Sequence, residues 1–378
     1  SAESAKTASV KAGVKPKATG ATAAKPKPKS PAKNTPLKAV RPAARVKRTV
    51  VVTEPKGNGR PVRNGAVDGK ASVRALIRGK PVLIDAVAPA RAVTAYSKAI
   101  DFLNNHTDYE RMRIVRYNTT TFNLDRMRTL LKYLGNPHLR FKTAHVAGTK
   151  GKGSTCHMLA AMCQAGGLKT GLYTSPHLVD IRERVQINGE MITPQALVEQ
   201  VRKIEPILRK MAADRPTFFE IFTALGFNYF AQHKVDIAII ETGLGGRLDS
   251  TNVLLPEVTA ITSISKDHMQ VLGNTLAKIA EEKAGIFKKD VPALTCVQEP
   301  EVLNVLRRVA THAGTNLEVV GTDIEFSYRF EAMRPMGPHM RVSLSTERSR
   351  FEHLAVPLLG EHQAVNCGLA LAMFDKLR

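Results

Sequence analysis

Residues 145–155, with the sequence HVAGTKGKGST, combine three glycines, two lysines and three hydroxyl side chains in one short stretch. Glycines allow backbone conformations that are closed to residues with a Cβ, so several N–H groups can converge on phosphate oxygens. Lys152 would contact the outer phosphates of a triphosphate, and a hydroxyl just after it would bind Mg²⁺. We therefore predict a phosphate-binding loop whose glycines are Gly148, Gly151 and Gly153 and whose hydroxyl residues are Ser154 and Thr155.

The surroundings of this segment also favour a phosphate loop. An apolar stretch before it indicates a buried strand, and residues 154–166 predict a helix whose positive dipole end points at the same spot. The segment departs from the strict Walker pattern, which has a glycine where Val146 stands. The alternative to a phosphate loop is a glycine-rich strand-to-helix turn with a solvated lysine. We favour the phosphate loop because three glycines, a lysine and two hydroxyls rarely gather in one turn for packing alone.

Further polar residues follow other predicted strands. Glu241 ends an apolar strand, where a carboxylate is costly to desolvate without a cation, and Mg²⁺ bound to a triphosphate would be a natural partner. A structural role, as a helix cap or the partner of a nearby arginine, is the alternative. Ser175 and His177 follow a second strand, and Asp267 and His268 follow a third. Ligands of open parallel sheets lie at the carboxyl ends of the strands, so we expect these residues to share one site.

Strands and helices alternate through the body of the chain, which predicts an α/β fold with a mainly parallel sheet. We expect strands at 141–148, 169–174, 235–241, 258–264 and 291–297, and helices at 154–166, 193–213, 217–234, 275–287 and 301–313. Beyond Gly321 the pattern changes to alternating polar and apolar residues, in segments such as 324–330 and 339–344. These segments predict small antiparallel strands appended at one edge.

The positive charge of the chain is concentrated near its N-terminus. Residues 1–80 hold 20 Lys and Arg against 3 Asp and Glu, a net charge of +17 out of +23 for the whole chain. The segment is rich in Ala, Lys and Pro, so it buries too little apolar surface to offset chain entropy. We predict a disordered basic tail over 1–80 and one domain over 81–378. Such a tail can contact polyanions non-specifically, but it contains no aromatic residue for base stacking, so we favour a role in solubility or tethering.

Cysteine usage and apolar runs indicate the compartment. The four cysteines, Cys156, Cys163, Cys296 and Cys367, show neither metal spacing nor a disulfide framework, which favours a reducing, cytoplasmic compartment. Cys156 and Cys163 lie on one predicted helix, and we expect both on its buried face. No apolar run reaches transmembrane length, so we expect no membrane partner. We expect a monomer.

Seven segments of the chain form an ordered series of motifs. They are AGTKGKGS at 147–154, LYTSPHL at 172–178, TFFE at 217–220, ETGLGGRLDSTN at 241–252, DH at 267–268, EKAGI at 282–286 and GEHQ at 360–363. Together they resemble the successive signatures of folylpolyglutamate synthase and dihydrofolate synthase, the folate branch of the Mur ligase superfamily. The likeness runs from about Thr94 to the end of the chain and keeps the order and spacing of every motif.

The resemblance implies roles for individual residues. ATP would be bound by Gly148, Thr149, Gly151, Lys152, Gly153, Ser154, Thr155 and Asn366. Mg²⁺ would be held by Ser154, Ser175, Glu241 and His268. Pteroate would contact Thr217, Phe218, Phe219, Glu220, Leu248, Asp249 and Ser250. Lys283 aligns with a lysine that is carbamylated in related enzymes, which turns a cation into a metal-binding carboxylate, so the catalytic set would be Lys152, His268 and Lys283.

The implied reaction is amide synthesis driven by ATP. A carboxylate of dihydropteroate or of a folate would attack the γ-phosphorus to give an acyl phosphate, which the amine of L-glutamate would then displace. Positioning and charge neutralisation dominate phosphoryl transfer, in keeping with backbone amides, Lys152 and Mg²⁺ in place of a covalent nucleophile. The residues leave open whether dihydropteroate, folylpolyglutamate or both are substrates, and His268 as a general base competes with its role as a metal ligand.

The sequence departs from the family pattern in a few places. Lys150 stands where the family usually has Asn, and Met269 where a polar residue is common. Family members continue past the His362-Gln363 helix into a separate nucleotide-fold domain, which we expect this chain to lack because it stops at Arg378. The alternative is a cell-wall Mur ligase. Those enzymes usually place Thr or Ser directly after the loop lysine, where Gly153 stands, which favours the folate branch.

Overall fold

The structure is a computed structural model that describes most of the chain beyond residue 90. The described residues are 73–77, 80–84, 90–109, 118, 121–266, 272–333 and 337–378. They all belong to one compact unit, Lys70–Arg378. Strands β1 (Val73–Ile77) and β2 (Lys80–Ile84) form an antiparallel hairpin across the domain boundary predicted at residue 80. The rest of the predicted basic tail, which is residues 1–72 and 78–79, lies outside the described residues.

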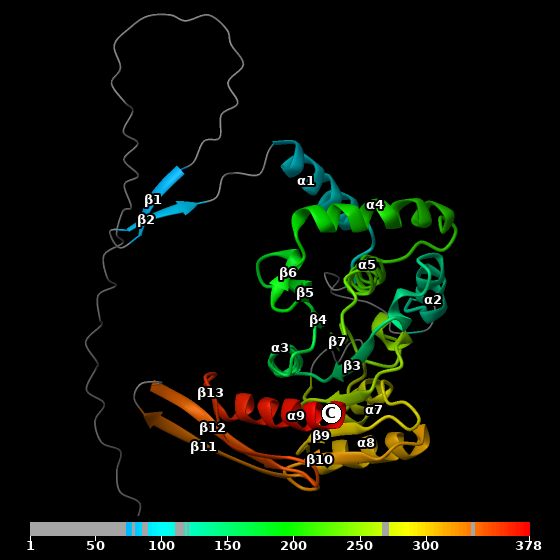
Figure 1. The fold of residues 1–378 in the computed structure, drawn as a ribbon. Coiled ribbons are helices and arrows are strands. Elements are labelled where there is room, and N and C mark those ends of the chain that lie inside the picture. The colour runs from blue at the N-terminus through cyan, green and yellow to red at the C-terminus, as the bar shows by residue number, and fades with distance from the viewer. Residues whose placement is uncertain are drawn as a thin grey trace, which may run out of the picture. The chain divides into compact units, whose positions relative to one another are not determined.

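An eight-stranded sheet forms the centre of this unit (Figure 1), with the strand order β10-β9-β8-β3-β7-β4-β5-β6. The parallel strands are β3 (Lys142–Ala147), β4 (Thr170–Tyr173), β7 (Ile237–Glu241), β8 (Val258–Ile261), β9 (Ala293–Cys296) and β10 (Leu317–Val320). Two short antiparallel strands, β5 (Val185–Ile187) and β6 (Glu190–Met191), complete one edge. The predicted mainly parallel sheet is confirmed.

Helices cover both faces of the sheet. They are α1 (Ala90–Asn104), α2 (Leu124–Tyr133), α3 (Lys152–Ala165), α4 (Pro194–Lys210), α5 (Phe218–Gln232), α7 (Leu276–Ala284), α8 (Pro300–Ala313) and α9 (Glu361–Leu377). Short 3-10 helices are η1 (Pro137–Leu139), η2 (Ile181–Arg184) and η3 (Ser250–Val253). Asn123, Thr193, Thr217 and Thr275 cap helices by accepting backbone N–H groups, which explains where these helices begin.

Strand β7 shows why the parallel strands are apolar throughout. Its alternate residues Ala238 and Ile240 belong to the core beneath α1, α4 and α5. Ile237 and Ile239 belong to a second core that contains residues of α3 and α9. Since successive side chains of a strand point to opposite faces, a sheet with helices on both sides buries all of them. None of the helices in the described ranges combines the length and apolar character needed to span a bilayer.

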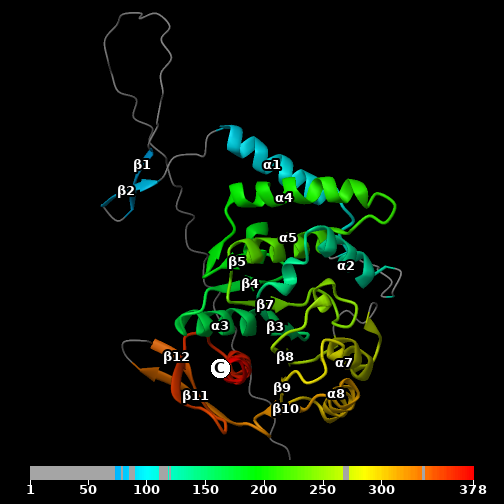
Figure 2. The same cartoon turned by 45° about the vertical axis from the view of Figure 1, so that its right-hand side comes forward.

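A second, three-stranded antiparallel sheet is formed by β11 (Glu325–Met333), β12 (Gly337–Ser345) and β13 (Arg350–Val356). The predicted appended antiparallel strands are confirmed, and they are not hydrogen-bonded into the main sheet. They form their own sheet, and α9 packs against both β12 and α3 (Figure 2). A ring of Phe326 fills the space beside Gly368 of α9, where an added Cβ would lie 2.5 Å away.

The predicted element boundaries need one correction that matters for the site. Helix α3 begins at Lys152, two residues before the predicted start at Ser154, because Gly151 adopts a left-handed conformation and ends the loop there. Lys152 therefore belongs to the first helical turn. The expectation that Cys156 and Cys163 share the buried face of this helix is confirmed, since both are fully buried.

Candidate functional site

The carboxyl ends of the central strands bring the predicted site residues to one edge of the sheet. Strand β3 leads into the phosphate loop, and β7 ends at Glu241, which is paired in register with Val146. Strand β4, beside β7, leads to Ser175, and β8, beside β3, leads to Thr262. Four segments that are distant in sequence thus meet where ligands of parallel sheets are found.

Two glycines of the phosphate loop lie where a side chain has no room. Gly148 has φ +149°, and an added Cβ would lie 1.8 Å from Oγ1 of Thr262. Gly151 has φ +86°, and an added Cβ would lie 2.3 Å from Oδ1 of Asn366. Both positions require glycine for the close approach as well as for the left-handed backbone. Asn366, predicted as a nucleotide contact, therefore lies directly against the loop.

Hydrogen bonds from neighbouring strands and helices hold the loop in place. The backbone N–H of Thr149 donates to the carbonyl of Ser263 at 2.9 Å, and its hydroxyl donates to the carbonyl of Ser265 at 3.2 Å. The ammonium of Lys283 is buried and donates to the carbonyl of Gly148 at 2.7 Å. The protein itself fixes the loop geometry, which is the preorganisation that phosphate binding needs.

Glu241 lies at the centre of this edge and is only 4% exposed. One carboxylate oxygen is 3.9 Å from the ammonium nitrogen of Lys152, and the other accepts the backbone N–H of Ser175 at 3.2 Å. A buried carboxylate needs such compensation. Arg247, the nearby arginine weighed above as a structural partner of Glu241, forms an ion pair with Glu282 at 2.8 Å. The Glu241 carboxylate thus faces the lysine of the glycine loop, as the predicted phosphate site requires.

Several hydroxyl groups in these segments are buried and find no hydrogen-bond partner among the described residues. They belong to Thr155, Ser175 and Thr242. An unpaired buried hydroxyl costs about 1–3 kcal/mol, so oxygen atoms left open beside a carboxylate favour a ligand that uses them. Hydroxyl and carboxylate oxygens are the donors that Mg²⁺ prefers. Ser175 and Glu241 therefore fit the predicted metal ion.

The remaining predicted nucleotide and metal residues are placed only in part. Gly153 and Ser154 lie in the first turn of α3, and a Cβ at Gly153 would lie 3.5 Å from the Glu241 carboxylate. His268 falls in residues 267–271, outside the described residues, so its convergence with Glu241 stays a prediction. In the part of the chain that the structure describes, no cluster of three or more His, Cys, Asp or Glu side chains could hold a metal ion by itself.

The motif at residues 217–220 forms the N-terminal turn of α5. Thr217 and Glu220 cap each other reciprocally, with the Thr217 N–H donating to the Glu220 carboxylate at 2.7 Å. Phe218 is buried at 1% exposure. Phe219 is partly exposed and packs on Gly243, where an added Cβ would lie 2.6 Å from its ring. Of these four predicted pteroate contacts, Phe219 is the side chain best placed to meet a ligand.

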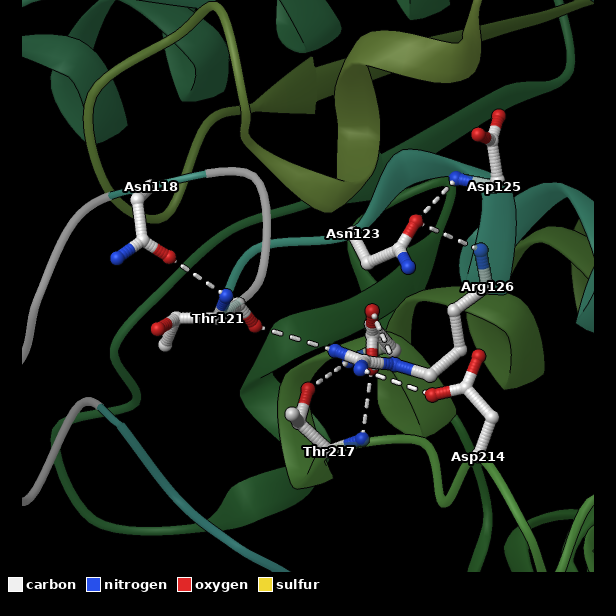
Figure 3. A network of polar contacts seen from close by, with 8 residues as sticks. Asn118, Thr121, Asn123, Asp125, Arg126, Asp214 and Thr217 are labelled. Atoms are coloured by element: carbon white, nitrogen blue, oxygen red, sulfur yellow. Dashed lines mark hydrogen bonds and ion pairs between the residues drawn. The ribbon is translucent and has the colours of Figure 1, made fainter.

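Arg126 on α2 ties this turn to its surroundings (Figure 3). Its Nε donates to both carboxylate oxygens of Glu220, at 3.0 and 2.9 Å. Its terminal nitrogens donate to Asp214 and to the carbonyl of Thr121, each at 3.2 Å. Arg126 is 8% exposed and Glu220 3% exposed, so this is a buried ion pair with several satisfied donors. The Glu220 carboxylate is engaged within the fold, so a contact of Glu220 itself with pteroate would use its backbone.

Leu248, Asp249 and Ser250 are all buried, and Asp249 is used to shape the loop that follows β7. One carboxylate oxygen accepts the N–H groups of Gly243 and Leu244, at 2.9 and 2.8 Å. The other accepts the N–H of Thr251 at 2.9 Å. Burial raises the pKa of Asp249, and these hydrogen bonds oppose that shift. The aspartate thus positions the loop that carries the predicted substrate contacts.

A buried histidine extends this network into the sheet. His145 on β3 is fully buried, and its Nε2 lies 2.8 Å from the hydroxyl of Thr251, which in turn donates to Asp249. Burial lowers the pKa of His145 to about 3, with a smaller contribution from the positive charge of Lys288. His145 therefore stays neutral and serves as a core hydrogen-bonding residue.

Two buried arginines beside the site were not among the predicted residues. Arg126 lies on α2, a helix outside the motifs, and Arg184 ends η2. A charge in sequence is more often a solvated surface residue than a buried one. For Arg126, the one available signal is Asn123 followed by a short amphipathic segment, a helix-start pattern that places the arginine one turn inside a buried face.

Comparison with known proteins agrees with these motifs. Residues 146–374 match the Mur ligase middle domain family. A dihydrofolate synthase/folylpolyglutamate synthase of Bacillus subtilis (strain 168) is 43% identical over 253 residues, which cover 66% of this chain and 58% of that protein. The chain thus spans less than two thirds of the length of this relative.

Solved structures share the fold. Mycobacterium tuberculosis folylpolyglutamate synthase complexed with ADP superimposes with a TM-score of 0.67 at 33% identity, over 76% of this chain and 62% of that one. An FPGS–AMPPCP–folate complex gives a TM-score of 0.67 at 33% identity, over 74% of this chain and 66% of that one. The family match, the ordered motifs and the shared fold together establish that the chain belongs to the Mur ligase family, in its folylpolyglutamate synthase and dihydrofolate synthase branch.

Proposed function

We propose that this chain is the ATP-binding part of a ligase that adds L-glutamate to a folate, to dihydropteroate, or to both. The observation that carries the proposal is the arrangement around Glu241: a buried carboxylate 3.9 Å from Lys152 of a glycine loop, with its other oxygen on the N–H of Ser175. The names of the B. subtilis relative and of the folate complex support the substrate class.

The proposed reaction has two steps. A substrate carboxylate oxygen bonds to the γ-phosphorus of ATP while the bond to the β-phosphate oxygen breaks, which gives an acyl phosphate and ADP. The amine nitrogen of L-glutamate then bonds to the carbonyl carbon, phosphate leaves, and the amine proton passes to solvent or to a base. Lys152 and the loop N–H groups meet the charge that builds on the transferring phosphoryl group. His268 is a candidate for the base or for a metal ligand.

Ser175, Glu241 and, by resemblance, Ser154 and His268 would hold Mg²⁺. Bound there, the ion would neutralise phosphate charge as a Lewis acid. The chain's own residues do the positioning, since Lys283 fixes the carbonyl of Gly148 and Asn366 lies against Gly151. Carbamylation of Lys283 would replace its positive charge by a carboxylate and is part of the proposal.

The substrate side would lie along the start of α5 and the loop after β7. Phe219 packs on Gly243 and offers an aromatic face for a flat pteroate ring, which fits the preference of aromatic rings for stacked partners. Further parts of the proposal are a cytoplasmic, monomeric enzyme and a basic tail over residues 1–80 that contacts polyanions non-specifically.

The test is a phosphate-release assay on the full-length natural protein with ATP, Mg²⁺ and L-glutamate. Folate and dihydropteroate are supplied in separate reactions, and a cell-wall precursor peptide in a third. Release that depends on glutamate together with either pteridine is expected, and the ratio of the two rates assigns the substrate. Release with the cell-wall precursor alone would identify the other branch of the family and overturn the proposal.

A further inference from the structure

Arg184 is a buried arginine that the proposed reaction does not use. It ends η2 (Ile181–Arg184) and is only 3% exposed. A guanidinium keeps its charge at every relevant pH and can only donate hydrogen bonds, so its burial demands specific partners. Its contacts reach two segments that the proposed function assigns to different ligands.

The first contact is with the loop that carries Ser175. The Nε of Arg184 donates to Nδ1 of His177 at 2.9 Å, and His177 lies two residues beyond Ser175. Because arginine has no acceptor, Nδ1 must accept and the imidazole proton lies on Nε2. The backbone supports the same contact, since the N–H of Thr174 donates to the carbonyl of Arg184 at 3.1 Å and closes the base of this loop.

The second contact is with the first turn of α5. The guanidinium carbon of Arg184 lies 5.4 Å from the ring centre of Phe218 and 5.8 Å from that of Phe222. The two rings stack on each other and are buried. A cation over a desolvated ring is attracted by its π electrons. Phe218 belongs to the predicted pteroate motif, so one side chain contacts both segments.

The loop that carries Ser175 and His177 is held by hydrogen bonds to the residue that precedes Arg184. The carboxylate of Glu183 accepts the N–H groups of Leu178, Val179 and Asp180, at 2.7, 3.0 and 2.7 Å. These three bonds fix the part of the loop that does not touch Arg184. Because Glu183 directly precedes Arg184, we expect a shift of Arg184 to displace this loop, with His177 and Ser175, as one body.

We propose that Arg184 is a positioning residue that holds the Ser175 loop and the start of α5 in one geometry, so that nucleotide binding and pteridine binding both depend on it. The proposal rests on the proposed function, which assigns these two segments to Mg²⁺–ATP and to the folate. His177 transmits the effect to the nucleotide side, and Phe218 transmits it to the folate side.

The experiment measures the dissociation constants of folate and of Mg²⁺–AMPPCP by calorimetry, each with the full-length natural protein. Arg184→Lys keeps the charge and loses the planar donor, and we expect both constants to rise about tenfold, the effect of losing a hydrogen bond to a charged group. His177→Leu should raise only the nucleotide constant, and His177→Asn, which retains an acceptor, should restore it to within about threefold of the wild type. Phe218→Leu should raise only the folate constant.

Arg209→Met is the matched control. Arg209 is an exposed arginine on α4 paired with Glu205, and its loss should change neither constant. Melting temperatures identify variants that fail to fold. If Arg184 had a purely structural role, Arg184→Lys would lower the melting temperature without raising the two dissociation constants. A folded Arg184→Lys variant that binds either ligand as the wild type does would overturn the proposal. A wild-type protein that binds neither ligand would instead refute the proposed function.

Discussion

The ammonium nitrogen of Lys283 on α7 lies 2.7 Å from the carbonyl oxygen of Gly148, 135 positions away in sequence. The contact ties α7 to the predicted phosphate-binding loop. Replacing Lys283 by Met removes a charged donor from a buried carbonyl, which should lower the free energy of unfolding by about 1–3 kcal/mol. Urea unfolding followed by circular dichroism measures this. Lys278→Met, at an exposed position of the same helix, should change it by less than about 0.5 kcal/mol.

Lys152 provides the most direct catalytic prediction. Lys152→Ala in the full-length natural protein should reduce ATP turnover by about 10²-fold or more, because the variant loses a cation that meets transition-state charge. Phosphate release measures the rate. Circular dichroism should match the wild type, since Lys152 is a partly exposed residue in the first turn of α3. Near-normal release by a folded variant would refute the assignment of this loop.

Arg126 and Arg128 allow a matched comparison of a buried and a surface ion pair on one helix. Arg126→Met leaves the carboxylate of Glu220 buried without its partner and should cost about 3–5 kcal/mol of stability. Arg128 is 56% exposed and pairs with an exposed Asp125, so Arg128→Met should cost no more than about 1 kcal/mol. Denaturant unfolding of both variants gives the two values. An equal loss of unfolding free energy in the two variants would show that the buried ion pair stabilises the fold no more than the surface pair does.

His145 predicts an acid sensitivity with a defined sign. Its folded pKa is lowered to about 3 from 6.5, so below pH 6.5 the unfolded chain binds a proton that the folded chain does not. Stability therefore falls as the pH drops from 6.5 towards 3, by up to about 1.4 kcal/mol per pH unit from this one group. In His145→Gln that slope should be smaller by the same amount. Unfolding free energies measured between pH 4 and 6.5 test it, and an unchanged slope would contradict the assignment.

The basic tail gives a prediction that separates charge from catalysis. Removing Ser1–Gly69, which lies before the compact unit, should leave the catalytic parameters unchanged. It should weaken retention on heparin and reduce its dependence on salt, because fewer cations release counterions. Loss of folate affinity in the shortened protein would show that the predicted boundary of the domain is wrong.

Local sequence patterns predict the positions of most candidate site residues at the strand ends. Glycine spacing located the phosphate loop, and the apolar run before Glu241 located the end of β7, because both signals lie within a few residues. Arg126 could not be foreseen in the same way, since its partner Glu220 is 94 positions away. Asp249 and Glu220 are predicted ligand contacts, and that role stays a prediction, while the structure shows that their carboxylates accept hydrogen bonds from within the protein. Sequence motifs mark such residues without revealing which direction the side chain faces.

The position of α9 has a consequence for how the protein is made. This helix fills the core on which α3 packs, and Asn366 touches Gly151 of the phosphate loop. A ribosome synthesises α3 about two hundred residues before α9, so the apolar side of α3 emerges from the exit tunnel long before its cover exists. The apolar side of α3 is therefore open to chaperones during that interval, and Asn366 reaches the glycine loop only after α9 has been made.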